Sequence, residues 1–378
     1  MKLFTPRRVG IDLGSSSIKI AEVVGVDSYG YAVLRRATIF PIPDGLIVAG
    51  VIKNPTALGK ALQQAVKKAA VPRQGFILGA SSRLVALGSV TSPDAVAPSE
   101  RISQIRLSQK ELSPTVPVQT ASISWNLLNT KVRGTNTIEN TLNVAMISQD
   151  EVDVLLNVAR LASLQPRAID LSAAATLRAL VRCTNNDMNV ATIVDVGASK
   201  TCIATRQGLH LRSLRVVPQG GNTMTRAILN ATEASYAEAE AVKLYLRVSS
   251  ENLASTSSGQ YTDITIESSY TPSPAEVAHA GVTEIKIDEI AKSIEADASL
   301  FPKSPSRGVQ LIGGASRVKG FVQKLSTRLG FPVVSARPWA DLQFNKYTAP
   351  LFTSGTPDTN AISDLTVATG LALWRPPT

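Results

Sequence analysis

The amino-acid sequence predicts an α/β protein of two similar halves around a ligand cleft, with a small α+β subdomain inserted in the first half. The main evidence is a repeated motif. Residues 11–17 (IDLGSSS) and 194–200 (VDVGASK) both read apolar, Asp, apolar, Gly, small, Ser. An apolar strand follows each copy, at 18–24 and 201–205. The length of 378 residues also exceeds the usual size of one domain.

The composition indicates a folded protein in a reducing compartment. The chain is 44% hydrophobic and 18% charged, which argues against extensive disorder. It has no run of 18 apolar residues, so no membrane span is expected. Residues 1–8 are basic but lack the apolar core of a signal peptide. Cys183 and Cys202 have neither metal-site spacing nor a disulfide framework. A cytoplasmic location is therefore expected.

The net charge of +10 suggests an anionic partner, but the basic residues are scattered in short pairs without interleaved aromatics. A solvated basic surface is the favoured interpretation, and no nucleic-acid partner is expected. Weak attraction to the anionic inner face of a membrane stays open.

The first elements are predicted to be strands around one long helix. After the first hairpin a strand is expected at 32–40. A helix should begin at Asn54-Pro55, because Asn can cap a helix and Pro suits its first position. Short strands are expected at 76–80 and 83–90.

The amino-acid composition changes over residues 91–165, where several prolines occur. A short helix is expected from Ser99, then strands at 121–128 and 142–148, and a helix at 149–164. This order predicts an inserted subdomain of helix, strand, strand and helix.

The second half is expected to repeat the scheme of the first. A helix at 169–182 leads into it. A strand is then expected at 191–196, followed by helices at 223–229 and 235–248 and a late helix through 287–301. The last elements are a strand at 309–312, a helix at 318–329 and a final apolar helix ending at Trp374. The Ser- and Thr-rich stretch 249–274 is interpreted as a loop, with one strand at 262–266.

These elements give a domain division. The first half is 1–90, completed by 165–185 and the C-terminal helix 362–375; the insert is 91–165; the second half is 186–361.

The first hairpin has the residues of a phosphate site. Gly14 permits close backbone approach, and successive N–H groups at such a tip form an anion-binding concavity. The hydroxyls of Ser15–Ser17 and the cation of Lys19 add donors. Asp12 and Asp195 would face phosphates only through Mg²⁺, which prefers carboxylate, water and phosphate oxygens. Either Asp-x-Gly alone reads as a tight turn, but the repeat favours phosphate binding.

Two later segments fit a base and ribose. Gly313-Gly314 follows a buried strand and opens a helix, although a plain turn is the alternative. Glu240 and Lys243 share a helix face, and a surface ion pair is the alternative there. The chain has neither a GxxxxGK[ST] loop nor a GxGxxG after a strand, which excludes those nucleotide-binding classes.

Taken together, these motifs resemble those of the actin-like ATPases. Residues 9–19 resemble their first phosphate motif, 193–203 their second and 309–320 their adenosine motif. Within that superfamily the sequence is most similar to the type IV pilus assembly family PilM, which is related to the cell-division protein FtsA. The segments PQGGN at 218–222 and ATGLAL at 368–373 add to this similarity.

The resemblance implies two ribonuclease-H-like domains around ATP and Mg²⁺. Asp12 and Asp195 would face the metal. The implied nucleotide-binding residues are Gly14, Ser15, Ser16, Ser17, Lys19, Gly197, Ser199, Thr201, Gly220, Gly221, Glu240, Lys243, Gly313, Gly314 and Ser316. Lys200, where relatives have a small polar residue, would either add a phosphate contact or point to solvent.

The resemblance also implies a function. In the PilM family, the insert and its adjoining cleft bind the short N-terminal cytoplasmic peptide of the bitopic membrane protein PilN. We therefore expect an ATP-gated scaffold, peripheral to the inner membrane through a PilN-like protein and other pilus platform proteins. Hydrolysis should be slow, since Asp170 is the best candidate for positioning water and also reads as a helix-start residue.

Two other functions are compatible with the same fold. A filament-forming, membrane-associated protein like FtsA ranks lower, because the chain stops at residues 374–378 without an amphipathic anchor helix. A small-molecule kinase of the same fold would need a substrate base and a sugar-sized pocket, and no motif suggests either.

Overall fold

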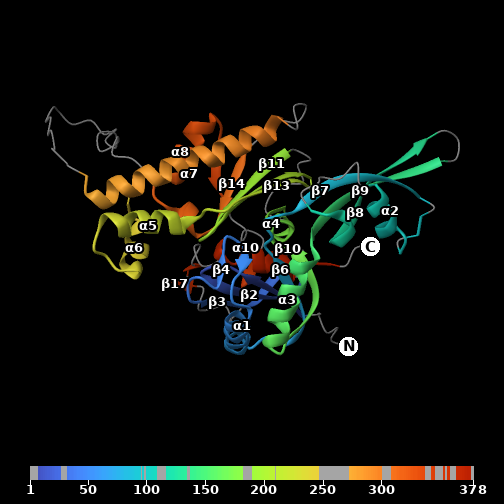
Figure 1. Ribbon diagram of the computed structural model, residues 1–378, viewed down its shortest axis with the longest axis horizontal. Helices are drawn as coiled ribbons and strands as arrows, with labels where there is room; N and C mark the ends of the chain where they lie inside the picture. Colours follow the sequence, from blue (N-terminus) through green and yellow to red (C-terminus); the bar gives the residue numbers. More distant parts are fainter. Residues whose placement is uncertain are drawn as a thin grey trace.

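Three β-sheets organise the molecule, and the ribbon has two lobes and a projecting arm (Figure 1). This computed structural model describes residues 7–26, 32–94, 96–97, 99–108, 116–133, 137–181, 190–208, 210–246, 272–299, 308–336, 342–344, 352–353, 356–357 and 363–375. None of the helices in these ranges is long and apolar enough to cross a membrane.

The first lobe is built on a six-stranded sheet of order β10-β6-β1-β2-β3-β16. The strands β1, β2 and β3 form an antiparallel meander, whereas β6 joins β1, β10 joins β6 and β16 joins β3 in parallel. Their bounds are β1 (Arg7–Leu13), β2 (Ser17–Val26), β3 (Ala32–Pro41), β6 (Gln74–Ala80), β10 (Gln165–Leu171) and β16 (Leu342–Phe344).

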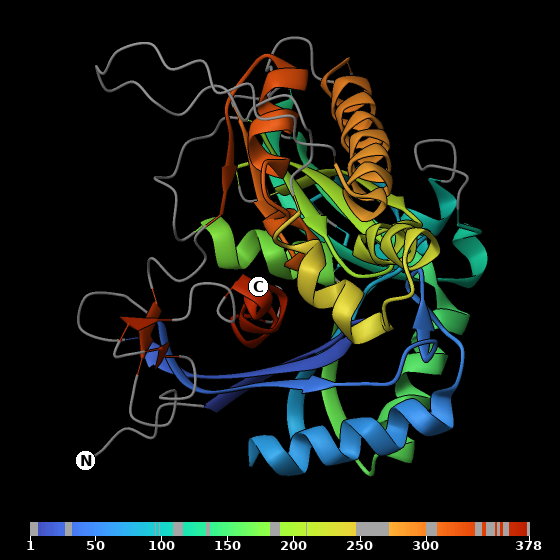
Figure 2. The same cartoon turned by 90° about the vertical axis from the view of Figure 1, so that its left-hand side faces the viewer.

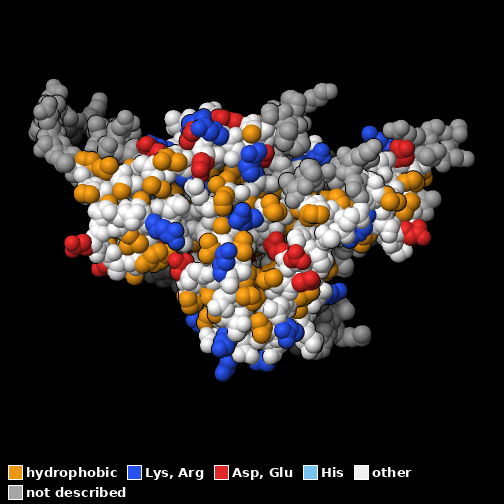
Figure 3. Space-filling model, in the orientation of Figure 1, with side chains coloured by type: hydrophobic (Ala, Val, Ile, Leu, Met, Phe, Trp, Pro, Cys, Tyr) orange, Lys and Arg blue, Asp and Glu red, His pale blue; other side chains and the backbone are white. Residues whose placement is uncertain are grey.

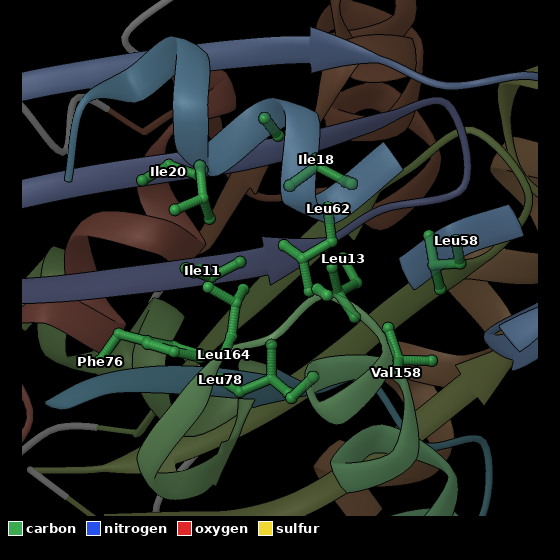
Figure 4. Close-up of a cluster of buried hydrophobic side chains, with 14 of the residues drawn as sticks. Ile11, Leu13, Ile18, Ile20, Leu58, Leu62, Phe76, Leu78, Val158 and Leu164 are labelled. Atoms are coloured by element: carbon green, nitrogen blue, oxygen red, sulfur yellow. The ribbon is translucent and has the colours of Figure 1, made fainter. Parts of the chain in front are cut away.

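Helices α1 (Pro55–Ala69) and α3 (Gln149–Leu161) cover one face of this sheet. Figure 4 shows their contact with the strands, where Ile11, Ile18 and Leu62 are fully buried. Helix α1 begins where the sequence predicts, because the Asn54 side chain accepts a hydrogen bond from the Ala57 N–H at 3.0 Å.

The second lobe has a five-stranded sheet of order β13-β12-β11-β14-β15. Its strands are β11 (Val190–Val196), β12 (Thr201–Gln207), β13 (His210–Val217), β14 (Val309–Ile312) and β15 (Val333–Ser335). Its helical elements are α5 (Gly221–Ala231), α6 (Tyr236–Lys243), α7 (Pro274–Ser299), η3 (Gly314–Arg317) and α8 (Phe321–Leu329).

The two lobes repeat one pattern. In each, an antiparallel hairpin (β1–β2 or β11–β12) is joined by a parallel strand (β6 or β14) at its first member. The register places Asp12 opposite Lys19 and Asp195 opposite Cys202. The duplication expected from the sequence is therefore present in the structure.

Helices α4 (Ser172–Val181) and α10 (Thr366–Ala372) lie between the two sheets. Figure 2 shows α10, in red, above the blue first sheet and below the second lobe. The helices cross very closely, since a Cβ on Gly370 would lie 1.8 Å from the carbonyl oxygen of Ala175. Side chains of α4, among them Leu177 and Leu180, pack on the second sheet, whereas α10 contacts β1 and β2.

The arm is a three-stranded antiparallel sheet of order β7-β9-β8 with helix α2 packed on it. Its elements are β7 (Ala86–Pro93), α2 (Arg101–Leu107), η2 (Val118–Thr120), β8 (Ala121–Arg133) and β9 (Thr137–Ser148). Two small hairpins complete the structure: β4 (Ile47–Val48) with β5 (Val51–Ile52), and β17 (Phe352–Thr353) with β18 (Thr356–Pro357).

Several expected elements differ from the structure. The segment from Ile169 to Leu171 continues strand β10, and helix α4 starts only at Ser172. Strand β7, expected in the first half, pairs within the arm. Helix α3, expected in the insert, packs on α1 because its apolar face fits the first sheet.

Helix α6 ends at Lys243 instead of running to 248, and β16 from the expected second half joins the first sheet. The strand expected at 262–266 lies outside the described residues, as does most of the 249–274 stretch.

Candidate functional site

A cavity of about 540 Å³ lies between the lobes, bordered by the turns of both hairpins. Of the residues predicted for nucleotide and metal, it is lined by Asp12, Gly14, Ser15, Ser16, Ser17, Lys19, Asp195, Gly197, Lys200, Gly221, Glu240, Lys243, Gly313 and Gly314. Positions from 12 to 314 in the sequence thus meet around one space.

The two hairpin turns have the same geometry. In the first, the Gly14 N–H donates to the Ser17 carbonyl oxygen at 3.0 Å, and in the second the Gly197 N–H donates to the Lys200 carbonyl at 3.0 Å. The tips also touch, because the hydroxyls of Ser15 and Ser199 are hydrogen-bonded to one another. The motif repeat therefore corresponds to a physical pair of facing loops.

Two carboxylates, one from each hairpin, approach the cavity. The pKa of Asp195 is raised to about 6, chiefly by burial; the positive charge of Lys19 opposes this shift, and the negative charge of Asp12 contributes to it. Lys19 Nζ lies 3.7 Å from Asp12 Oδ2. Among the described residues there is no cluster of three or more His, Cys, Asp or Glu side chains that could hold a metal. An ion here would need phosphate and water oxygens to complete its shell, as Mg²⁺ commonly does.

Glycines allow the backbone to close around this site. A Cβ on Gly313, whose φ is +88°, would lie 2.4 Å from Asp195 Oδ1. A Cβ on Gly220 would lie 2.3 Å from the Gly197 carbonyl oxygen. At these two positions no larger residue fits without moving the backbone.

Glu240 and Lys243 form an ion pair, as the alternative interpretation expected, but the pair lines the cavity and its lysine is buried. Lys243 Nζ is buried, lies 2.6 Å from Glu240 Oε1 and donates to Thr225 Oγ1 at 3.0 Å. Both residues line the cavity, beside the start of α5 at Gly221.

Lys200 crosses the interface between the lobes instead of pointing to solvent. Its Nζ donates to the Ser81 hydroxyl at 2.5 Å and to the Ser81 carbonyl oxygen. Burial lowers the pKa of Lys200, and the neighbouring carboxyl groups of Asp12 and Asp195 oppose that shift. Next to it, the Ala49 N–H donates to Ser199 Oγ at 3.0 Å.

Four predicted residues lie beside the cavity without lining it: Ser199, Thr201, Gly220 and Ser316. Thr201 Oγ1 donates to the Gln219 carbonyl at 2.9 Å, and Ser316 Oγ donates to the Gly313 carbonyl at 2.7 Å. These hydroxyls hold the backbone of the loops that line the cavity.

The structure does not bring Asp170 into this cavity, so its expected role in positioning water is not supported. Asp170 lines a second cavity, where its carboxylate pairs with Arg178. Burial raises the pKa of Asp170, and the charge of Arg178 opposes that shift. Because Asp170 belongs to strand β10 and not to a helix start, its side chain is placed by the sheet.

The sequence did not single out Asp364 and Arg317, which also line the first cavity. Arg317 Nη2 lies 3.0 Å from Asp364 Oδ2, joining the adenosine-motif loop to the segment before α10. No local motif marks such a pair, because its members are 47 residues apart.

The second cavity, of about 850 Å³, lies where the arm meets the first lobe. Its walls include two sheet edges, β8 of the arm and β10 of the first lobe. Leu156 of α3 lines it and is 43% exposed, and Trp125, Arg167 and Trp374 contribute further. The cavity therefore combines apolar side chains with main-chain groups at strand edges.

Comparison with known proteins gives two family matches. The family described as "Type IV pilus assembly protein PilM" matches residues 10–253, and "Cell division protein FtsA" matches residues 192–369.

Two solved structures illustrate the shared fold. One is a "PilM-PilN type IV pilus biogenesis complex", with 21% identity, a TM-score of 0.73 and coverage of 99% of this chain and 98% of that one. Another is a "MamK double helical filament", with 15% identity, a TM-score of 0.52 and coverage of 98% and 99%. These likenesses show the two-domain actin-like ATPase fold.

Proposed function

The chain belongs to the type IV pilus assembly family PilM. From that premise we propose that it is an ATP-binding scaffold whose affinity for a PilN-like membrane protein depends on the bound nucleotide. The observation that carries the proposal is the pair of equivalent hairpin turns facing one another across a single cavity.

The cavity residues fit MgATP. The turn N–H groups, Lys19 and Lys200 would hold the phosphates, and Asp12 and Asp195 would face the magnesium ion. The pair of the half-exposed Glu240 and the buried Lys243, together with residues 313–314, would surround the adenosine. A volume of about 540 Å³ lies within the range of ligand pockets. When bound, ATP would supply a cleavable γ-phosphate.

We expect slow hydrolysis. A water-activating carboxylate would have to be free of strong cationic partners. Asp364 is paired with Arg317, and Glu240 is paired with Lys243. Asp44 also lines the first cavity but is exposed to solvent, and Asp170 lies in the other cavity. The protein is thus proposed to use nucleotide for switching more than for turnover.

A short route connects the two cavities. The ammonium of Lys200 is bonded to Ser81, and it would be drawn from that partner by a phosphate in the first cavity. The next residue, Ser82, lies beside Glu151 in the first turn of α3. Leu156, one further turn along α3, lines the second cavity. We propose that nucleotide alters the second cavity by this path.

The second cavity suits an extended peptide. Exposed strand edges offer main-chain hydrogen bonds, and side-chain pockets between them give specificity. The edges of β8 and β10 flank the cavity, and Leu156 and Trp125 supply apolar contact. The solved relative is a complex of PilM with PilN. We propose that this chain binds the N-terminal cytoplasmic peptide of a PilN-like protein here, which places it at the cytoplasmic side of the inner membrane.

We predict that Leu156→Asp weakens binding of this peptide by at least about tenfold, because it removes an apolar contact and buries a charge. Fluorescence anisotropy of a labelled peptide from the PilN-like protein, titrated with the full-length chain, measures the effect. Ile285→Asp is the matched control, since Ile285 is 64% exposed on α7 and outside both cavities.

Equal losses in the two variants would contradict the assignment of the second cavity. The same titration with saturating MgATP tests gating, and we expect the peptide affinity to change at least about threefold. An affinity that does not respond to MgATP would exclude gating while leaving the peptide site intact.

A filament-forming role like that of FtsA is the second candidate, and the FtsA family match over residues 192–369 favours it. The PilM match includes the arm and the two strand edges, β8 and β10, that border the second cavity, which favours the pilus function.

A further inference from the structure

The excess positive charge of this protein is concentrated in its first quarter. Residues 1–90 contain twelve Lys and Arg but four Asp and Glu, which accounts for +8 of the net charge of +10. The remaining residues are nearly neutral. A distribution this uneven gives residues 1–90 a positive field of their own, although α3 of the same lobe carries Asp150, Glu151 and Asp153.

The acidic residues of this segment leave its outer surface uncompensated. Asp12 and Asp44 line the cavity between the lobes. Glu22 is fully buried, and its carboxylate oxygens lie 3.4 Å from Arg35 Nη1 and 3.4 Å from Arg36 Nη1. The fourth acid, Asp27, lies outside the described residues.

The outer side of helix α1 presents only basic and amide side chains along one stripe. Its exposed positions Lys60, Gln63, Gln64, Lys67 and Lys68 follow the spacing of one helix face. The stripe extends beyond the helix end, where Arg36 donates to the Ala70 carbonyl at 2.7 Å and Arg73 is exposed.

We call the surface formed by Lys60, Lys67, Lys68 and Arg73 the basic face. In Figure 3 the lower tip of the molecule, where α1 lies in Figure 1, shows Lys and Arg side chains and no Asp or Glu. This tip is convex, and neither of the two cavities is lined by any residue of the basic face.

We propose that the basic face docks directly on an anionic lipid surface. Long, flexible cationic side chains on a convex helix suit a broad, diffuse negative surface, which requires no fixed geometry. Single-stranded nucleic acid would call for a groove with stacking aromatics. The exposed aromatic side chains of the described residues, Tyr236 and Tyr245, belong to α6 and the turn after it, in the other lobe.

The position of the basic face fits this partner. Helix α1 packs directly against α3, and α3 contributes Leu156 to the second cavity. A membrane protein held in that cavity and a lipid surface held by the basic face would engage the same lobe. The lipid contact depends only on the charges of α1 and its surroundings, and it stands whether or not the peptide site is correct.

The test is co-sedimentation of the full-length chain with vesicles of phosphatidylcholine containing about one-third phosphatidylglycerol, against phosphatidylcholine alone. We expect binding to the anionic vesicles only, and a strong decrease as salt is raised. The variant Lys60→Glu with Lys67→Glu should lose at least about tenfold in affinity, since each cation near such a surface contributes about fivefold.

The matched control is Lys131→Glu with Lys319→Glu, which makes the same change in net charge at exposed positions of the arm and the second lobe. Circular dichroism and the peptide titration show whether each variant is folded. If both variants lost the same affinity for anionic vesicles, the loss would follow from net charge alone, and the proposal would be overturned. Failure of the wild type to bind anionic vesicles, or tighter binding to duplex DNA than to vesicles, would also overturn it.

Discussion

Gly370→Ala is expected to destabilise the protein by about 3 kcal/mol or more. The added Cβ would lie 1.8 Å from the Ala175 carbonyl oxygen, and backbone atoms cannot turn aside as a side chain can. Helices α4 and α10 would have to separate, which would loosen the contact of Leu371 and Val367 with α4. These helices lie beneath the cavity, so nucleotide binding should weaken as well.

Urea unfolding followed by circular dichroism measures this change. Gly281→Ala is the control, because Gly281 is an exposed residue within α7 and a Cβ there would meet nothing within 4 Å. That variant should be stabilised by roughly 0.5–1 kcal/mol, as for a glycine replaced by alanine in a helix. If both variants unfolded at the wild-type urea concentration, the close crossing of α4 and α10 would be wrong.

Asp195→Asn is expected to lower the affinity for MgATP by about 100-fold or more. The change keeps the size of the side chain but removes one of the two carboxylates that the hairpins direct at the proposed magnesium ion. Isothermal titration calorimetry with MgATP measures the affinity. Repeating it with ATP and a chelator should bring the wild type close to the variant.

Asp153→Asn is the matched control, since Asp153 is exposed on α3 and accepts a hydrogen bond from Gln149 Nε2 at 2.9 Å. It should bind MgATP as the wild type does. Full MgATP affinity in the Asp195→Asn protein would refute the metal assignment.

The parts of the fold that local sequence determines were predicted well. Both hairpins follow from short apolar strands joined by a turn at Gly14 or Gly197, and strand β14 covers the predicted residues 309–312. The start of α1 at Asn54 is likewise a local feature, because cap and helix are adjacent in sequence. Such signals need no knowledge of the rest of the chain.

The features that long-range packing decides were not predictable. Residues 165–171 contain alanine and leucine next to a helix, yet pairing with β6 makes them a strand. That pairing moves Asp170 to the second cavity. In the same way, the ion pair of Arg317 and Asp364 exists only because the lobes bring two distant segments together.

In the proposed nucleotide complex, both hairpin turns hold one nucleotide at once. Hydrogen–deuterium exchange of the full-length chain, with and without MgATP, tests it most directly. We predict that MgATP slows exchange in the turns at 14–17 and 197–200 together, with the same dependence on nucleotide concentration. Protection of only one turn, or of neither, would contradict a shared site between the lobes.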